Sequence, residues 1–248
     1  MKLCYYPGCT LKTNAKNFED STLFSLKALG IEVTELQRWN CCGTVFSLAD
    51  DDLMHQIAPI RNLIRVKEND TNEVMTLCAM CYNTLKRANE RLKNNPQDLY
   101  KINQFMYRED IDYQGDVRIL HLLEVLKEKI GFTKLAKDVK KPLKNLKAAA
   151  YYGCLLVRPK EIGLDNVENP TILEKLLDCL GATPIDFPIK TECCGAYKTV
   201  DSPEIIAHRT NQILSSAQNQ GAEIVVVSCP LCAFNLDQRQ KETSQNFP

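Results

Sequence analysis

The chain has 248 residues, of which 44% are hydrophobic and 25% are charged, so it is long enough for one large domain or two smaller ones. Thirty-one basic residues balance thirty-one acidic ones, which leaves no net field to attract nucleic acid or an anionic membrane surface. No apolar run approaches the roughly 20 residues that cross a bilayer, and the first residues lack a secretion signal. We therefore expect a cytoplasmic protein in a reducing compartment, where disulfides are disfavoured.

The first part of the chain is expected to alternate short strands with helices. A helix over 18–29 should end at Gly30, because glycine is favoured just past a helix C-terminus. The other expected elements are a short strand before Cys9, a strand near 31–36, a helix over about 51–66 and a strand over 73–77. Residues 96–146 follow as a helical connection, with helices expected over 97–109 and 119–130. Six lysines within 134–147 are interpreted as a solvated face.

The last part repeats the first. The order is again strand, helix, strand, helix and strand, and the expected ranges after the first strand are a helix over 171–180, a strand over 183–187, a helix over 203–218 and a strand over 224–228. The run from Ile224 to Ser228 is β-branched and continuous, which is typical of a strand buried on both faces of a parallel sheet. The predicted fold is therefore α/β, with two duplicated small units that have short parallel sheets. The predicted divisions are 1–95, the connection 96–146, and 147–248.

Ten of the twelve cysteines fall into one frame that is written twice. In each frame a single cysteine is followed by an adjacent pair and then by Cys-x-x-Cys. The frames are Cys9, Cys41, Cys42, Cys78 and Cys81, and then Cys154, Cys193, Cys194, Cys229 and Cys232. The motifs lie at the predicted carboxyl ends of strands, where ligands collect in parallel sheets. We expect the five cysteines of each frame to converge.

The number of cysteines per frame bears on the kind of site. A structural zinc needs four ligands, and a cubane 4Fe-4S cluster also uses four cysteines, so either would leave one thiol over. Five thiolates suit an enlarged or irregular iron-sulfur cluster, and zinc in one repeat stays open as an alternative. Cys4 and Cys179 lie outside the frames and are interpreted as structural. His55, His121 and His208 are expected on helices or their ends, as packed or solvated side chains.

The doubled frame resembles the cysteine-rich CCG domains found in the B subunit of heterodisulfide reductase, over nearly the whole chain. Tyr152-Gly153-Cys154, Arg158-Pro159, Glu168-Asn169-Pro170, Cys193-Cys194-Gly195-Ala196 and Cys229-Pro230-Leu231-Cys232 are similar to that family's second repeat in order and spacing. The resemblance implies two noncubane 4Fe-4S clusters, one held by each frame of five cysteines. It also implies that a small-molecule disulfide is cleaved between the two clusters, each of which delivers one electron.

The resemblance further implies partner proteins. Electrons would arrive from a ferredoxin-like iron-sulfur protein (the C-type partner of that family), which is fed by a flavin-containing protein (the A-type partner). The chain itself has no ferredoxin motif and no dinucleotide fingerprint. Two alternatives stay open: an electron-relay subunit of a hydroxy-acid or glycerol-3-phosphate dehydrogenase complex, and a zinc-stabilised structural module.

Overall fold

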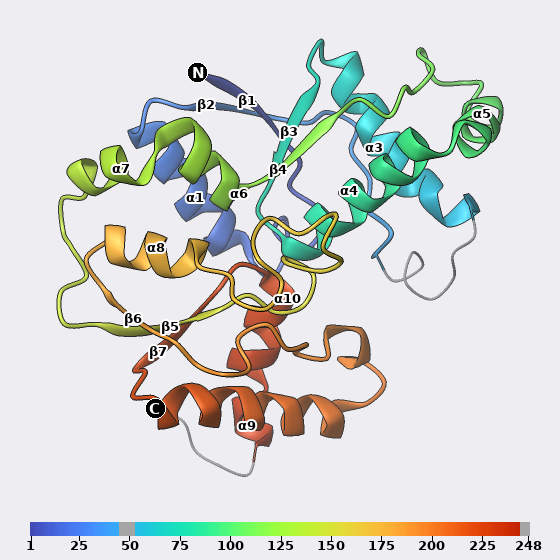
Figure 1. Ribbon diagram of the computed structural model, residues 1–248. Helices are drawn as coiled ribbons and strands as arrows, with labels where there is room; N and C mark the ends of the chain where they lie inside the picture. Colours follow the sequence, from blue (N-terminus) through green and yellow to red (C-terminus); the bar gives the residue numbers. More distant parts are fainter. Residues whose placement is uncertain (45–52, 244–248) are drawn as a thin grey trace. The chain divides into compact units, whose positions relative to one another are not determined.

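The computed structural model describes residues 1–44 and 53–243 (Figure 1). The chain forms two compact units, Met1–Leu122 and Leu123–Pro248, each of which is built on a parallel sheet. The stretch 96–146 is thus shared between the two units, and the predicted division at 95 and 147 stays a prediction. Among the described helices, none combines the length and the apolar character needed to cross a membrane.

Unit 1 contains a four-stranded parallel sheet in the order β2-β1-β3-β4. The strands are β1 (Lys2–Tyr5), β2 (Glu32–Glu35), β3 (Glu73–Thr76) and β4 (Arg118–His121). Strand β3 lies between β1 and β4, so Val74 and Met75 are almost completely buried. Burial of this apolar interior is what stabilises the short strands.

The helices of unit 1 pack on this sheet and on one another. They are α1 (Lys16–Ala28), η1 (Leu53–Gln56), α3 (Ile57–Glu68), α4 (Ala79–Asn94) and α5 (Pro96–Phe105). Helix α1 ends before Gly30, whose φ of +76° suits glycine. Helix α5 begins where Asn95 accepts a hydrogen bond from the Asp98 amide, with Pro96 in the first turn.

Unit 2 contains a three-stranded parallel sheet in the order β6-β5-β7. The strands are β5 (Lys147–Tyr151), β6 (Thr183–Ile185) and β7 (Ile224–Val227). The central strand β5 is fully buried from Ala148 to Ala150. These small side chains allow the covering elements to approach the sheet closely.

The helical segments of unit 2 include several short turns. They are α6 (Leu122–Glu124), the π-helix η2 (Val125–Ile130), α7 (Phe132–Asp138), α8 (Ile172–Cys179), η3 (Ala196–Lys198), α9 (Pro203–Asn219), α10 (Pro230–Ala233), the π-helix η4 (Phe234–Gln238) and η5 (Gln240–Glu242). Helix α9 is joined to η4 by a buried hydrogen bond from the Thr210 hydroxyl to the Asn235 carbonyl, 3.0 Å long.

The α/β fold with short parallel sheets is confirmed, and so are most of the expected strands and helices. The helix expected from about residue 51 begins in η1 at Leu53, and positions 51 and 52 lie outside the described residues. All six lysines within 134–147 are exposed, as interpreted. His55 and His208 lie on helical segments.

The helix expected over 119–130 is wrong in its first part. Residues 118–121 form strand β4, which pairs with β3 from Arg118 opposite Glu73 to His121 opposite Thr76. A short apolar run fits a buried strand and a helix equally well, and pairing with a strand 45 positions earlier decides between them. His121 is therefore a buried strand residue rather than a helical one.

The prediction that the run from Ile224 is buried on both faces is also wrong. Strand β7 lies at an edge of its sheet, and Ile224 is 42% exposed. In the part of the chain that the structure describes, no fourth strand pairs with β7, whereas β4 occupies the corresponding place in unit 1.

Candidate metal centre

The cysteine motifs of each unit lie at the carboxyl ends of its strands. In unit 1, Cys9 follows β1, the pair Cys41 and Cys42 follows β2, and Cys78 follows β3. Cys78 is the residue before α4, and Cys81 lies in the first turn of that helix. Carboxyl ends of parallel strands meet at one edge of a sheet, which brings distant cysteines together. Unit 2 repeats this placement, with Cys154, Cys193, Cys194, Cys229 and Cys232 after β5, after β6 and around the start of α10.

The thiols of unit 1 lie in contact with one another. The Sγ atoms of Cys9 and Cys41 are 4.0 Å apart, and those of Cys42 and Cys81 are 3.6 Å apart. Hydrogen bonds also link Cys41 to Cys42 and Cys78 to Cys81. The five cysteines of the first frame therefore form one cluster of side chains.

The thiols of unit 2 are gathered in the same way. The Sγ atoms of Cys194 and Cys232 are 3.4 Å apart, Cys154 is hydrogen-bonded to Cys193, and Cys229 to Cys232. The expectation that each frame converges is thus met by the geometry. All twelve cysteines are free thiols, and none of the described residues forms a disulfide.

Each cluster has a buried side and a more accessible side. In unit 1, Cys42, Cys78 and Cys81 are buried, whereas Cys9 and Cys41 are exposed. In unit 2, the corresponding buried cysteines are Cys194, Cys229 and Cys232, and Cys154 and Cys193 are partly exposed. A small molecule that reached either unit from solvent would meet the first cysteine and the first member of the adjacent pair.

The donor set fits an iron-sulfur group. Soft thiolates favour iron-sulfur clusters and zinc, and each unit offers five thiols without a histidine among them. Within residues 1–44 and 53–243, no three Cys, His, Asp or Glu side chains are arranged to hold a single metal ion. The thiols contact each other directly instead. Five gathered thiols match a group of several metal atoms better than a four-coordinate zinc.

The pKa values of the thiols in unit 1 are shifted in opposite directions. Hydrogen bonds with Cys41 and Cys81 lower the pKa of Cys42, against the opposing effect of burial. Hydrogen bonds with Cys42 and Cys78, together with burial, raise the pKa of Cys81. A thiolate in this buried set is thus stabilised by neighbouring thiols that keep their protons.

Unit 2 follows the same rule, and it adds a cation. The hydrogen bond with Cys154 is the largest cause that lowers the pKa of Cys193, to about 6, and the charge of Arg209 contributes. The Arg209 Nε also donates to the carbonyl of Cys193, at 3.1 Å. A hydrogen bond with Cys194 and burial raise the pKa of Cys232. Arg209 lies on α9, 16 residues after Cys193, so sequence proximity did not reveal it.

A buried tyrosine holds the adjacent pair in each unit. The Tyr6 hydroxyl donates to the carbonyl of Asn40 at 2.8 Å, and the Tyr151 hydroxyl donates to the carbonyl of Glu192 at 2.7 Å. Each acceptor immediately precedes an adjacent cysteine pair. Burial, and then the neighbouring thiols, raise the pKa of both hydroxyls, which therefore stay protonated donors. Tyr6 thus corresponds in structure to Tyr151.

Glycines allow the cysteine-bearing loops to approach each other. Gly8 has φ +72°, and a Cβ there would lie 2.9 Å from the Cys81 Sγ. Gly153 has φ +65°, and a Cβ there would lie 3.4 Å from the Cys232 Sγ. In both units the glycine before the first cysteine lies beside the last cysteine of the frame, and in unit 1 a side chain at this position would be too close to its sulfur.

The two cysteines outside the frames lie apart from the clusters. Cys4 is on β1, and burial raises its pKa to about 11. Cys179 ends α8, and its thiol donates to the Phe132 carbonyl at 3.1 Å. The burial of Cys4 and the hydrogen bond of Cys179 fit the structural role expected for these residues.

Comparison with known protein families identifies the same repeated frame. The family model of the CCG cysteine-rich domain matches residues 3–86 and 148–237. The first matched range lies in unit 1 and the second in unit 2. Each range contains one complete frame of five cysteines.

Several relatives match nearly the whole chain. A relative in Wolinella succinogenes named 8-methylmenaquinol:fumarate reductase membrane anchor subunit is 33% identical, with coverage of 98% of this chain and 84% of the relative. The B subunit of the ferredoxin/F(420)H(2)-dependent CoB-CoM heterodisulfide reductase of Methanosarcina acetivorans is 30% identical, over 99% of this chain and 83% of its own. A protein of Archaeoglobus profundus, named as similar to the B subunit of heterodisulfide reductase, is 27% identical, over 100% of this chain and 86% of its own.

A solved structure supports the fold. The crystal structure of a hypothetical protein from Helicobacter pylori superposes with a TM-score of 0.77 at 13% sequence identity. The match covers 98% of this chain and 45% of that protein, so this chain spans less than half of its length.

Proposed function

Since the chain belongs to the CCG cysteine-rich domain family, we propose that it is an iron-sulfur reductase subunit that cleaves a small-molecule disulfide. The observation that carries the proposal is the gathering of five thiols at the carboxyl edge of each sheet, once per unit. Relatives named after the B subunit of heterodisulfide reductase, at 27–30% identity over nearly the whole chain, support a reductase component.

We assign one noncubane 4Fe-4S cluster to each unit. The ligands would be Cys9, Cys41, Cys42, Cys78 and Cys81 in unit 1, and Cys154, Cys193, Cys194, Cys229 and Cys232 in unit 2. Such clusters supply one-electron transfer through iron held by thiolates. The contacts within each cluster of thiols and the count of five per unit support the assignment.

The chain's own residues would prepare both sites in two ways and the site of unit 2 in a third. Tyr6 and Tyr151 fix the loops that carry the adjacent pairs, and Gly8 and Gly153 allow the last cysteine to approach. Arg209 places a positive charge beside Cys193, which favours the thiolate needed by a metal.

Two such units match the stoichiometry of the reaction. Cleaving one S–S bond takes two electrons and two protons and yields two thiols, so two one-electron centres suffice. The electrons would come from partner subunits, namely a ferredoxin-like iron-sulfur protein and a flavin-containing protein. The relatives are named as subunits, which supports membership in a larger complex.

A second candidate is an electron-relay subunit. The Wolinella succinogenes relative is named as a subunit of a quinol:fumarate reductase. This name does not refer to a disulfide substrate, so it supports a role in electron transfer. A relay for a hydroxy-acid or glycerol-3-phosphate dehydrogenase belongs to the same class. A zinc-stabilised module is the third candidate, and five thiols per unit weigh against it.

The composition of the anaerobically purified chain tests the cofactor. We expect a brown protein with about eight iron atoms per chain, because each of the two thiol clusters would hold four. Cys179→Ala is the matched control, since this cysteine lies outside both clusters, and it should keep all of the iron. A colourless chain with stoichiometric zinc would contradict the proposal and favour the structural module.

Viologen-coupled reduction of candidate disulfides, with the partner subunits present, tests the activity. The double variant Cys41→Ala with Cys193→Ala should abolish it, because each substitution removes a proposed ligand from one cluster. If the double variant still reduced disulfides, the proposed role of the clusters would be contradicted. An iron-loaded chain that passes electrons between its partners but reduces no disulfide would favour the relay.

A further inference from the structure

The two units differ at one edge of their sheets. In unit 1, β3 has β1 on one side and β4 on the other. In unit 2, the corresponding strand β7 pairs with β5 alone among the described residues. The correspondence is direct, since β3 ends two residues before Cys78 and β7 ends two residues before Cys229.

Strand β4 shows what a fourth strand does for its neighbour. It runs parallel to β3, and its apolar residues Ile119 and Leu120 are buried. Beside it, Val74 and Met75 of β3 are 1% and 0% exposed. Strand β7 carries four apolar β-branched residues, yet every one is partly or largely exposed. An edge strand of this kind presents backbone hydrogen-bonding groups that can serve as a template for another strand.

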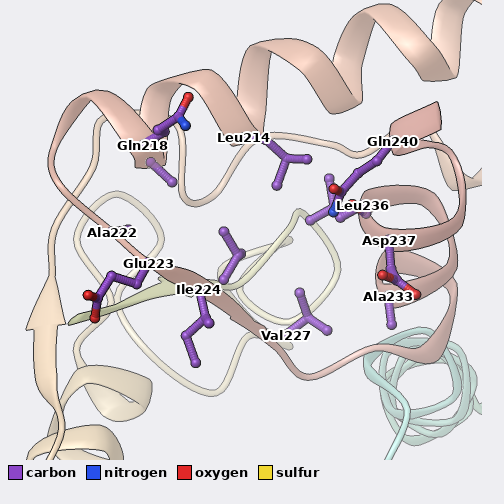
Figure 2. Close-up of a pocket in the computed structure, with 12 residues that line it drawn as sticks. Leu214, Gln218, Ala222, Glu223, Ile224, Val227, Ala233, Leu236, Asp237 and Gln240 are labelled. Atoms are coloured by element: carbon purple, nitrogen blue, oxygen red, sulfur yellow. Dashed lines mark hydrogen bonds between the residues drawn. The ribbon is translucent and has the colours of Figure 1, made fainter. Parts of the chain in front are cut away.

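A groove lies beside β7. Its volume is about 390 Å³, and it is lined by residues from α9, β7, η4 and the segments that flank them. Figure 2 shows Leu214 of α9, Val227 of β7 and Leu236 of η4 around this space. The groove is thus apolar at its centre and adjoins the exposed side chains of the edge strand.

The charge of the groove is acidic. Glu223 and Asp237 lie on opposite sides of the space in Figure 2, and both are exposed. No lysine or arginine is among the described residues that line it. In unit 1, the strand in the corresponding place begins with Arg118, which pairs with Glu73 of β3 at 3.4 Å.

We propose that the free edge of β7 and the adjoining groove accept an extended segment of a partner subunit, which adds a fourth strand to the sheet of unit 2. The segment has an apolar centre and a basic residue near its start, and it runs parallel to β7 as β4 runs parallel to β3. Backbone hydrogen bonds and the apolar groove supply the affinity, and the acidic rim selects the charge. The inference rests on the proposed function in one respect, namely that the chain works within a complex.

A partner of opposite charge fits this edge better than a second copy of the chain. Two copies paired through β7 would bring the same acidic side chains, Glu223 and Asp237, to the shared groove. Like charges that face each other across an interface oppose association.

A peptide provides the test. The probe is a fluorescent peptide with the sequence of residues 115–122, because this segment contains β4. We expect saturable binding to the full-length chain, measured by fluorescence anisotropy under anaerobic conditions. Ile224→Lys should weaken binding at least about tenfold, because a lysine on an edge strand blocks pairing. Ile205→Lys is the matched control on α9, with 47% exposure against 42% for Ile224, and it should leave binding unchanged.

The charge is tested by a second peptide in which glutamate replaces the arginine. It should bind more weakly than the first, and Asp237→Asn should reduce the difference between the two. The inference is overturned if no saturable binding occurs, if a scrambled peptide binds equally well, or if Ile224→Lys has no effect. A dimer in sedimentation that Ile224→Lys dissociates would assign the edge to a second copy instead.

Iron content is measured on the same preparations. Peptide binding by a chain that holds no iron would contradict the proposed function and leave the edge-strand inference intact. If an iron-loaded chain bound the peptide equally well with and without Ile224→Lys, the edge-strand inference would be contradicted and the proposed function would stand.

Discussion

At the scale of single residues, the glycine before the first cysteine of each frame lies close to the sulfur atom of the last cysteine. Gly8 and Gly153 both have a positive φ, and a Cβ at Gly8 would lie 2.9 Å from the Cys81 Sγ, whereas a Cβ at Gly153 would reach ordinary contact with the Cys232 Sγ at 3.4 Å. Backbone strain therefore disfavours other residues at both positions, and contact with the last cysteine adds to this at Gly8. A glycine before the first cysteine is thus part of each site, although it ligates nothing.

Replacing Gly8 by alanine should therefore remove the iron of unit 1. The new Cβ would lie 2.9 Å from the Cys81 Sγ, so the loop that carries Cys9 or the start of α4 has to move. We expect the iron content of the anaerobically purified variant to fall to the amount that unit 2 holds.

Gly30→Ala is the matched control for this prediction. Gly30 has φ +76°, close to the value at Gly8, but nothing lies within 4 Å of its Cβ position. It should lose about 1 kcal/mol of stability from strain and keep all of its iron. If both variants lost iron equally, backbone strain rather than contact with Cys81 would be the cause.

At the scale of elements, a lysine that forms a buried ion pair also connects the two cysteine-bearing loops of unit 2. The Lys190 ammonium contacts Glu174 of α8 at 2.8 Å, and the side chains are 7% and 16% exposed. Tyr152 donates to the same carboxylate, and the backbone amides of Tyr152 and Gly153 donate to the Lys190 carbonyl. Lys190 therefore connects the loop before Cys193 with the loop before Cys154.

Lys190→Met should destabilise unit 2 by about 3 kcal/mol, because it leaves the Glu174 carboxylate buried without its cation. The measurement is the urea unfolding midpoint under reducing conditions. Lys198→Met is the control, since Lys198 and Asp201 are 57% and 59% exposed, and it should change stability by about 0.5 kcal/mol or less. Equal effects of the two substitutions would contradict the role assigned to burial.

Unit 1 also has a lysine paired with a buried glutamate, but this lysine comes from a different position in the frame. Glu19 of α1 is 2% exposed, accepts from the Tyr5 hydroxyl and pairs with Lys12 at 2.8 Å. Lys12 follows the first cysteine of its frame, whereas Lys190 precedes the adjacent pair. Each unit thus buries one carboxylate near the loops of its cluster and neutralises it with a nearby lysine.

At the scale of the whole molecule, the proposed reaction depends on the duplication, because it uses the thiols of both units. Each unit contains a complete set of five thiols and its own sheet, and the family model matches each one separately. Under the proposed function, in which each unit delivers one electron, disulfide reduction requires both units to be loaded.

The paired substitution Cys41→Ala with Cys42→Ala should remove the iron of unit 1 and leave that of unit 2. Cys193→Ala with Cys194→Ala should do the opposite. Both variants should lose disulfide reduction completely, because in the proposed reaction each centre delivers one of the two electrons. Iron analysis and the viologen assay check this, and half activity in either variant would contradict a joint role of the two clusters.

The sequence by itself determined the cysteine sets, the α/β alternation and the duplication. Spacing along the chain is enough to predict these features. Each Cys-x-x-Cys lies where a strand passes into a helix, and the carboxyl ends of parallel strands meet at one edge of a sheet. The convergence expected from spacing is therefore what the distances show, from Cys9 near Cys41 to Cys194 near Cys232.

Only the tertiary structure decided the rest. The run at Ile119 fits helix and strand equally well until it pairs with β3, and β7 reads as a buried strand until its place at the sheet edge leaves Ile224 exposed. Arg209 reaches Cys193 because α9 packs beside it, not because of its position in the chain. The physical reason is common to all three: pairing, burial and charge contacts form between residues far apart in sequence, whereas periodicity and motif spacing report neighbours.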